Sequence, residues 1–158
     1  GRMQVIDGGP KWPRVVVDYA HTPDAIEKAL AALRPQCRGE LICIVGCGGD
    51  RDSGKRAQMG RAAAKGSDRV WFTSDNPRSE DPERILADMA HGLELPNSQR
   101  VRSEVNRAEA IAVALQSADP DDILLIAGKG HEQTQEINGE FIPFSDFTVV
   151  HDIQGENN

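Results

Sequence analysis

Short apolar runs rich in β-branched residues alternate along the chain with segments in which apolar residues recur every three or four positions. The runs predict strands buried on both faces, and the spaced positions predict helices that cover a sheet. Strand and helix alternate four times, which predicts an α/β fold: a Rossmann-like, mostly parallel sheet flanked by helices, in a single domain over residues 1–158. The predicted strands are 14–18, 41–45, 69–73, 101–103 and 123–127.

Capping signals set the boundaries of the predicted helices. Thr22 offers a side-chain acceptor ahead of Pro23, whose fixed φ suits the first helical position. A second helix is predicted over 55–65, with Gly66 as its C-terminal cap. A third helix begins at Asp81-Pro82. A fourth begins at a capping box of Asn106 and Glu109 and ends at about Ser117.

The end of the chain carries a turn signal and then a less regular pattern. Asn138-Gly139 joins two short runs and predicts a C-terminal β-hairpin over 134–142, because both turn residues tolerate positive φ. The segment 148–150 consists of β-branched residues, which are poor helix formers. The pattern therefore assigns no element after about Asp146, and a polar tail is expected from about Gln154.

Composition and charge exclude several classes of function. The chain carries 25 acidic and 18 basic side chains, a net charge of −7, which argues against a general nucleic-acid or anionic-membrane surface. Its apolar runs are far shorter than the ~20 residues that a membrane span needs. The three cysteines lack the spacing of metal ligands, so we predict no metal site and free thiols in a reducing, cytoplasmic location.

Polar side chains gather where four of the predicted strands end. The carboxyl ends of parallel strands meet at one edge of a sheet, and ligands of open α/β sheets bind there. Cations and acids are mixed in these loops, a combination that suits a zwitterion because guanidinium groups bind carboxylates and acids bind ammonium groups. The mixed set is Arg51, Arg78 and Lys129 with Asp75 and Glu132, together with Asn76.

One of these loops resembles a phosphate-binding loop without completing it. Gly49, Gly54 and Lys55 match most of the pattern, but Arg56 stands where a Ser or Thr would hold magnesium. Two nearby aspartates would also face the phosphates. We interpret the loop instead as glycine-permitted backbone amides that present Arg51 to an anionic ligand.

Taken together, the loops resemble the C-terminal domain of the Mur ligases over about residues 1–147. Asp75-Asn76-Pro77-Arg78 is the most specific part, because in this family it marks the enzymes that add meso-diaminopimelate rather than lysine. The family usually continues into a helix after the hairpin, where this chain has its β-branched run. The other matching motifs are Asp18-Tyr19-Ala20-His21-Thr22-Pro23-Asp24, Gly46-Cys47-Gly48-Gly49-Asp50-Arg51-Asp52 and Gly128-Lys129-Gly130-His131-Glu132.

The resemblance implies an ATP-dependent, amide-bond-forming ligase of peptidoglycan precursor synthesis. ATP and Mg²⁺ would activate a carboxylate of UDP-N-acetylmuramoyl-L-alanyl-D-glutamate as an acyl phosphate, and the amino group of meso-diaminopimelate would attack it. Family members also carry an N-terminal UDP-binding domain and a central ATPase domain, which are absent from this chain. The resemblance therefore implies that the chain alone is inactive and binds neither ATP nor Mg²⁺.

Residue roles follow from the same resemblance. None of the residues is expected to act as an acid or base, because orienting an amine against an activated carbonyl can supply much of the rate. Three residues, Arg2, Asp18 and His21, would face the nucleotide. The residues expected to bind diaminopimelate are Arg51, Asp75, Asn76, Pro77, Arg78, Gly128 and Glu132.

Other readings of the same loops stay open. The chain could be a stand-alone small-molecule binding module without chemistry. It could also be the C-terminal domain of another Mur-type ligase, such as a lysine-adding enzyme, a folylpolyglutamate synthetase or a cyanophycin synthetase. For Arg78, the alternative is that it pairs with Glu80 or Asp81 and contacts no ligand.

Overall fold

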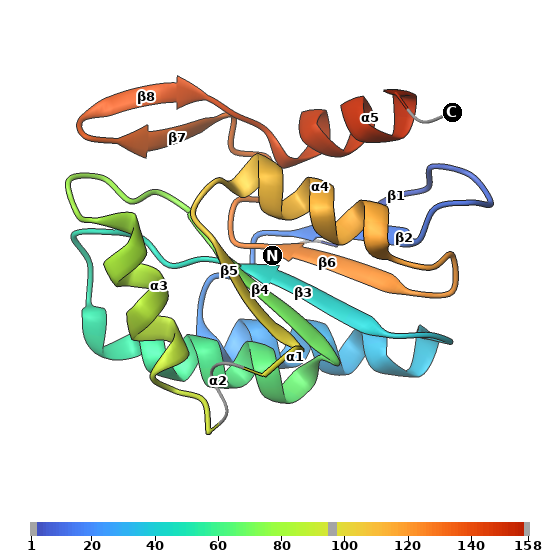
Figure 1. Ribbon diagram of the computed structural model, residues 1–158, viewed down its shortest axis with the longest axis horizontal. Helices are drawn as coiled ribbons and strands as arrows, with labels where there is room; N and C mark the ends of the chain where they lie inside the picture. The colour runs from blue at the N-terminus through green and yellow to red at the C-terminus, as the bar shows by residue number, and fades with distance from the viewer. Residues whose placement is uncertain (1–2, 95–97, 157–158) are drawn as a thin grey trace.

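The computed structural model describes residues 3–94 and 98–156, in which six strands form one twisted sheet (Figure 1). The strand order is β1-β2-β6-β3-β4-β5; β1 runs antiparallel to β2, and all other neighbours are parallel. The mostly parallel sheet is confirmed, with β1 as an edge strand that the sequence pattern did not predict. The strands are β1 (Gln4–Ile6), β2 (Arg14–Asp18), β3 (Leu41–Val45), β4 (Arg69–Thr73), β5 (Val101–Glu104) and β6 (Ile123–Ala127).

Helices cover both faces of the sheet and create two apolar cores (Figure 1). Because side chains alternate along a strand, Val16 faces one core while Val15 and Val17 face the other. The first core lies under α1 (Pro23–Leu33), α2 (Arg56–Gly66) and α3 (Pro82–Ala90). The second lies under α4 (Arg107–Ser117) and α5 (Asp146–Glu156). Short 3₁₀ turns, Arg34–Gln36 and Ser53–Lys55, follow α1 and precede α2. No helix in the described ranges is long and apolar enough to cross a membrane.

The predicted N-terminal caps are present, with one correction to the capping box. Thr22 accepts from the Ala25 amide at 3.1 Å, and Asn106 accepts from the Glu109 amide at 3.1 Å. The reciprocal contact of the box is missing, because the Asn106 amide donates instead to Glu104 Oε2 at 2.9 Å. The strand that precedes α4 therefore supplies the acceptor that we expected from within the helix.

Gly66 is not the C-terminal cap that the sequence predicted. It is the last residue of α2, and Ser67 takes the cap position with extended backbone. A Cβ at Gly66 would lie 2.8 Å from Leu30 Cδ1. Gly66 thus allows α2 to approach α1, and its role is helix packing rather than helix termination.

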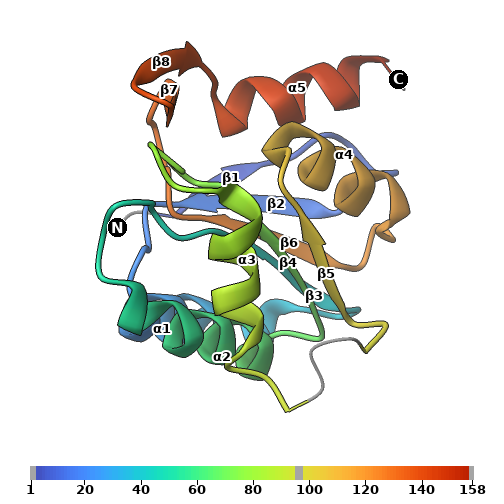
Figure 2. The same ribbon diagram turned by 60° about the vertical axis from the view of Figure 1, so that its left-hand side comes forward.

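The C-terminal region holds a confirmed hairpin and a helix that the pattern did not assign. In the hairpin, β7 (Thr134–Ile137) pairs with β8 (Glu140–Pro143), and both turn residues have positive φ, as a type I′ turn requires. The expected polar tail is wrong, because α5 continues to Glu156 and Gln154 is buried. Val150 and Ile153 pack into the second core, so tertiary burial overrides their low helix propensity. Figure 2 shows α5 and the hairpin side by side, on the α4 side of the sheet.

Candidate functional site

The loops that follow β2, β3, β4 and β6 enclose a cavity of about 440 Å³ at the carboxyl edge of the sheet. This is the edge at which the sequence placed a ligand site. Each of the four predicted polar loops contributes to the wall. Seven of the predicted site residues line the cavity: His21, Arg51, Asp75, Asn76, Arg78, Gly128 and Glu132.

Two of the predicted site residues, Asp18 and Pro77, do not line it. The buried Asp18 carboxylate accepts from the Ala20 amide at 2.7 Å, and the Asp18 carbonyl accepts from the Gly128 amide at 3.0 Å. Asp18 thus fixes two of the loops instead of facing the cavity. Pro77 is buried beneath the wall. Arg2 lies outside the described residues.

Lys129 is the buried counter-ion of two acids that line the cavity. Its ammonium is fully buried and donates to Asp75 Oδ1 at 3.2 Å, Asn76 Oδ1 at 3.0 Å and Glu132 Oε1 at 3.3 Å. Three acceptors match the three N–H donors of a lysine, so Lys129 has no donor left for a ligand. We conclude that Lys129 holds the two carboxylates in place, and that Asp75 and Glu132 keep other oxygens for the cavity.

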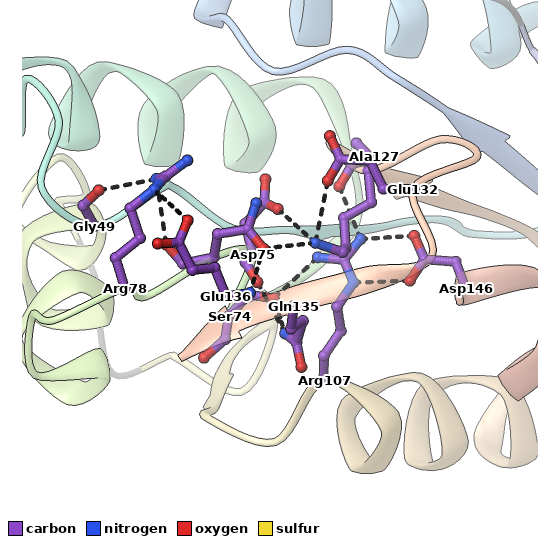
Figure 3. A network of polar contacts seen from close by, with 12 residues as sticks. Gly49, Ser74, Asp75, Arg78, Arg107, Ala127, Glu132, Gln135, Glu136 and Asp146 are labelled. Atoms are coloured by element: carbon purple, nitrogen blue, oxygen red, sulfur yellow. Dashed lines mark hydrogen bonds and ion pairs between the residues drawn. The ribbon is translucent and has the colours of Figure 1, made fainter. Parts of the chain in front are cut away.

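Arg78 reaches the cavity with most of its hydrogen bonds already made. Its Nε donates to Glu136 Oε1 at 3.2 Å, and its Nη1 donates to the Gly49 carbonyl at 2.9 Å (Figure 3). Neither Glu80 nor Asp81 pairs with it, so the alternative pairing considered from the sequence is wrong. Within the described ranges Nη2 makes no hydrogen bond, and it remains as the donor that can meet a ligand.

The glycine-rich loop before α2 has three of its backbone amides bonded within the protein. Gly49 N donates to the Asn76 carbonyl at 2.8 Å, and Gly54 N donates to Asp52 Oδ1 at 2.9 Å. The Asp50 amide donates to Glu80 Oε1 at 3.0 Å. These three amides therefore already have acceptors within the protein. The exposed Arg51 side chain, however, does line the cavity.

Arg56 explains why this loop departs from the phosphate-loop pattern. Its buried guanidinium donates to Glu80 Oε2 at 2.6 Å, Asp88 Oδ2 at 3.0 Å and the Gly48 carbonyl at 3.2 Å. The hydrogen bonds from Arg56 hold the pKa of Glu80 at about 2. The residue at the magnesium-ligand position is therefore a structural cation that ties α2 to α3.

A buried arginine that the sequence analysis missed holds the ends of two strands. Arg107 pairs with Asp146 through Nε and Nη2 at 2.8 and 2.9 Å, and both side chains are fully buried. Its remaining donors reach the carbonyls of Ser74 and Ala127, at 3.1 Å each (Figure 3). A signal existed, because cations are unfavourable in the first turn of a helix. Arg56 and Arg107 both begin helices, and both are buried.

Cysteine chemistry and metal binding find no support in this part of the molecule. All three cysteines are free thiols, as predicted. Cys47 is in the cavity wall, and burial raises its pKa to about 12, so the thiol stays protonated and unreactive at neutral pH. Among residues 3–94 and 98–156, no group of three or more His, Cys, Asp and Glu side chains could hold a metal ion.

Comparison with known proteins gives one family match and relatives that carry the same enzyme name. A family described as "Mur ligase, glutamate ligase domain" matches residues 1–130. A UDP-N-acetylmuramoyl-L-alanyl-D-glutamate–2,6-diaminopimelate ligase of Coxiella burnetii is 53% identical over 146 residues, which are 92% of this chain and 29% of that protein. The enzyme of the same name from Pseudomonas putida is 55% identical over 148 residues, 94% of this chain and 29% of its own length.

Solved structures agree with these relatives. A structure of a diaminopimelate ligase of that name superimposes with a TM-score of 0.93 at 46% identity, covering 99% of this chain and 32% of that one. A bifunctional folylpolyglutamate synthase/dihydrofolate synthase from Yersinia pestis, complexed with AMPPNP and Mn, superimposes over 100% of this chain and 31% of its own with a TM-score of 0.61. At 22% identity the latter shares the fold alone. The chain spans less than a third of the length of these relatives and, by its match, belongs to the Mur ligase family as its C-terminal, glutamate ligase domain.

Proposed function

We propose that this chain is the amino-acid-binding domain of a longer ATP-dependent ligase that adds meso-diaminopimelate to UDP-N-acetylmuramoyl-L-alanyl-D-glutamate. The observation that carries the proposal is that Arg78, Asp75 and Glu132 line one cavity. Arg78 Nη2 makes no hydrogen bond within the described ranges, and both acids are paired with Lys129. A zwitterion with a second carboxylate matches this arrangement. The relatives at 53–55% identity carry the corresponding name.

The chemistry assigned to the chain is capture and orientation. Asp75 and Glu132 would bind an ammonium group, Arg51 and Arg78 the carboxylates, and the wall at Asn76 and Gly128 would complete the site. The free amine of the bound amino acid would attack an acyl phosphate delivered by the rest of the protein. The C–N bond forms as the C–O bond to the phosphate breaks, phosphate leaves with that electron pair, and the amine nitrogen releases one proton to solvent. Holding the amine within reach accounts for the contribution of this chain to the rate.

Three further assignments concern the nucleotide-facing residue, the ATP and Mg²⁺ site, and the location of the protein. His21 lines the outer wall of the cavity and is the proposed nucleotide-facing residue, whereas Asp18 supports the loops. ATP and Mg²⁺ are assigned to other parts of the full-length protein, since the buried Arg56 stands at the magnesium-ligand position of the glycine-rich loop and the Gly49, Asp50 and Gly54 amides are bonded within the protein. A reducing, cytoplasmic location is consistent with three free thiols.

A stand-alone binding module is the competing proposal, and calorimetry on this chain discriminates. Tight binding of diaminopimelate by the isolated chain would favour the module. Weak or absent binding, with activity in the full-length protein, would favour the ligase. A panel of diaminopimelate, lysine and glutamate on the full-length protein then tests whether it is a different Mur-type ligase.

Replacement of Arg78 tests the proposed specificity. Diaminopimelate differs from lysine by one carboxylate, and Nη2 of Arg78 is the donor available for it. Losing one partner of a desolvated charged pair costs about 2–5 kcal/mol, so Arg78→Ala in the full-length enzyme should raise KM for diaminopimelate at least about tenfold. The use of lysine should change far less.

The control is Arg84→Ala, which removes the same charge from an exposed position on α3 outside the cavity. It should leave both substrates unaffected. Equal losses on diaminopimelate and lysine, together with a lower melting temperature, would show that Arg78 serves the loop and not the ligand. A wild-type enzyme that does not accept diaminopimelate would refute the proposed function itself.

A further inference from the structure

The segment from Asn76 to Arg78 is held from outside the sheet by the hairpin. The Glu136 amide donates to Asn76 Oδ1 at 3.0 Å, and the Arg78 amide donates to the Glu136 carbonyl at 2.8 Å. The Asn138 amide in turn donates to the Arg78 carbonyl at 2.7 Å, and Arg78 forms a parallel bridge with Ile137. The loop therefore lies against β7 like a short extra strand.

These contacts fix a backbone conformation that an arginine adopts at a cost. Arg78 has φ of 54°, in the left-handed region that is uncommon for residues with a Cβ. Such conformations persist only where the surroundings determine them. At Arg78 both backbone polar groups are bonded to the hairpin, so the hairpin determines the direction in which the side chain leaves the loop.

Glu136 also fixes the guanidinium itself. Its Oε1 accepts from Arg78 Nε at 3.2 Å, while the Gly49 carbonyl accepts from Nη1 on the other side (Figure 3). Two contacts in different directions set the plane of the group and leave Nη2 toward the cavity that Arg78 lines. The side chains of Arg78 and Glu136 are 19% and 27% exposed, so neither is part of a core whose loss would unfold the chain.

We infer that Glu136 is a positioning residue that aims Arg78 at the second carboxylate of the incoming amino acid; this inference rests on the proposed function. A long side chain that is already ordered loses less rotamer freedom when a ligand binds. The family match ends at residue 130, before β7 begins. Preference for a diacid would thus depend on a contact supplied from outside residues 1–130.

Kinetics of the full-length enzyme test the inference with three variants. Glu136→Ala removes the side-chain acceptor, and Glu136→Gln keeps an acceptor oxygen of the same reach. Glu140→Ala removes an exposed acid from β8 that, within residues 3–94 and 98–156, forms no hydrogen bond or ion pair with the Arg78 side chain. Glu136→Ala should raise KM for diaminopimelate about fivefold, the effect of one partly exposed charged hydrogen bond, with kcat unchanged. KM for lysine should not change, and the other two variants should stay within about twofold of wild type.

Several results would overturn the inference. These are an unchanged KM for diaminopimelate in Glu136→Ala, an equal rise in KM for lysine, or a Glu136→Gln variant as impaired as Glu136→Ala. If the wild-type enzyme does not accept diaminopimelate, the proposed function fails, and the hydrogen exchange of the Arg78 Nε–H, followed by NMR, decides the positioning role alone. That exchange should be slow in wild type and Glu136→Gln and fast in Glu136→Ala; equal rates would refute it.

Discussion

Replacing Arg107 with methionine should destabilise the chain severely, because it leaves a buried carboxylate without its counter-ion. Asp146 is fully buried and loses both of its hydrogen bonds, at 2.8 and 2.9 Å. The carbonyls of Ser74 and Ala127 each lose a donor at 3.1 Å. Methionine fills a similar volume with apolar atoms, so the loss comes from unpaired polar groups rather than from a cavity.

The expected magnitude follows from the cost of breaking a buried pair. Removing one partner of such a pair costs about 3–5 kcal/mol. Domains are stable by about 5–15 kcal/mol, so the variant should lose a large part of its free energy of unfolding. At about 2–4 °C per kcal/mol for a chain of this size, the melting temperature should fall by about 6–20 °C.

Denaturant titration of four proteins measures the effect as a double-mutant cycle. Asp146→Leu alone should be as harmful as Arg107→Met, because it leaves the guanidinium buried and unpaired. The double variant should lose no more than either single one, which gives a coupling energy of at least about 3 kcal/mol. As a control, Arg34→Met breaks a half-exposed pair with Asp68, 45% and 40% exposed, and should cost less than about 1 kcal/mol. Additive losses, or a loss below about 1 kcal/mol for Arg107→Met, would refute the reasoning.

Two further predictions concern acid stability and close packing. The folded-state pKa of Glu80 is about 2 and its ordinary value is 4.5, so its pair with Arg56 stabilises the fold above pH 4.5 and is lost as the pH falls toward 2. The side chain is 25% exposed, so Glu80→Gln should remove only about 1–2 kcal/mol of this acid-dependent stability, measured by urea titration at pH 6 and 3. At Gly49 a Cβ would lie 1.8 Å from the Pro77 carbonyl oxygen, so Gly49→Ala should cost at least about 2 kcal/mol. Gly155→Ala, in open space within α5, should stabilise by about 0.5–1 kcal/mol, and the reverse order of melting temperatures would contradict the packing argument.

Local sequence patterns predicted the strands and helices that are determined by residues close together in the chain. The buried runs at β3 and β6 read as strands, and Thr22 and Asn106 read as helix starts, because each signal lies within a few residues of its effect. Strand β1 was missed because three residues carry too little pattern. Helix α5 was left unassigned because its stability comes from packing against α4 and from the pair of its first residue, Asp146, with Arg107 of α4, not from local helix propensity.

For the candidate site, topology predicted which loops meet, but not which side chains pair. Parallel strands place their carboxyl ends at one edge, so four loops could be assigned to one cavity from sequence. The pairs that shape the cavity join residues far apart in the chain: 58 positions for Arg78 and Glu136, and 39 for Arg107 and Asp146. The periodicity of hydrophobic positions along the chain contains no information about such distant pairs. The sequence therefore identified Arg78 and Lys129 as cations of the site without revealing how few of their donors remain free.

The position of β6 has a consequence for biosynthesis. It lies between β2 and β3 in the sheet, although it is the last strand of that sheet to be synthesised. Until residues 123–127 leave the ribosome, β2 and β3 have no common neighbour, and each presents an unpaired apolar edge of the kind that promotes aggregation. Residues 128–132 follow β6 directly and close the cavity. A nascent chain that stops before β6 thus lacks both a complete sheet and a ligand site, so chaperone binding to stalled chains should decline only once β6 has emerged.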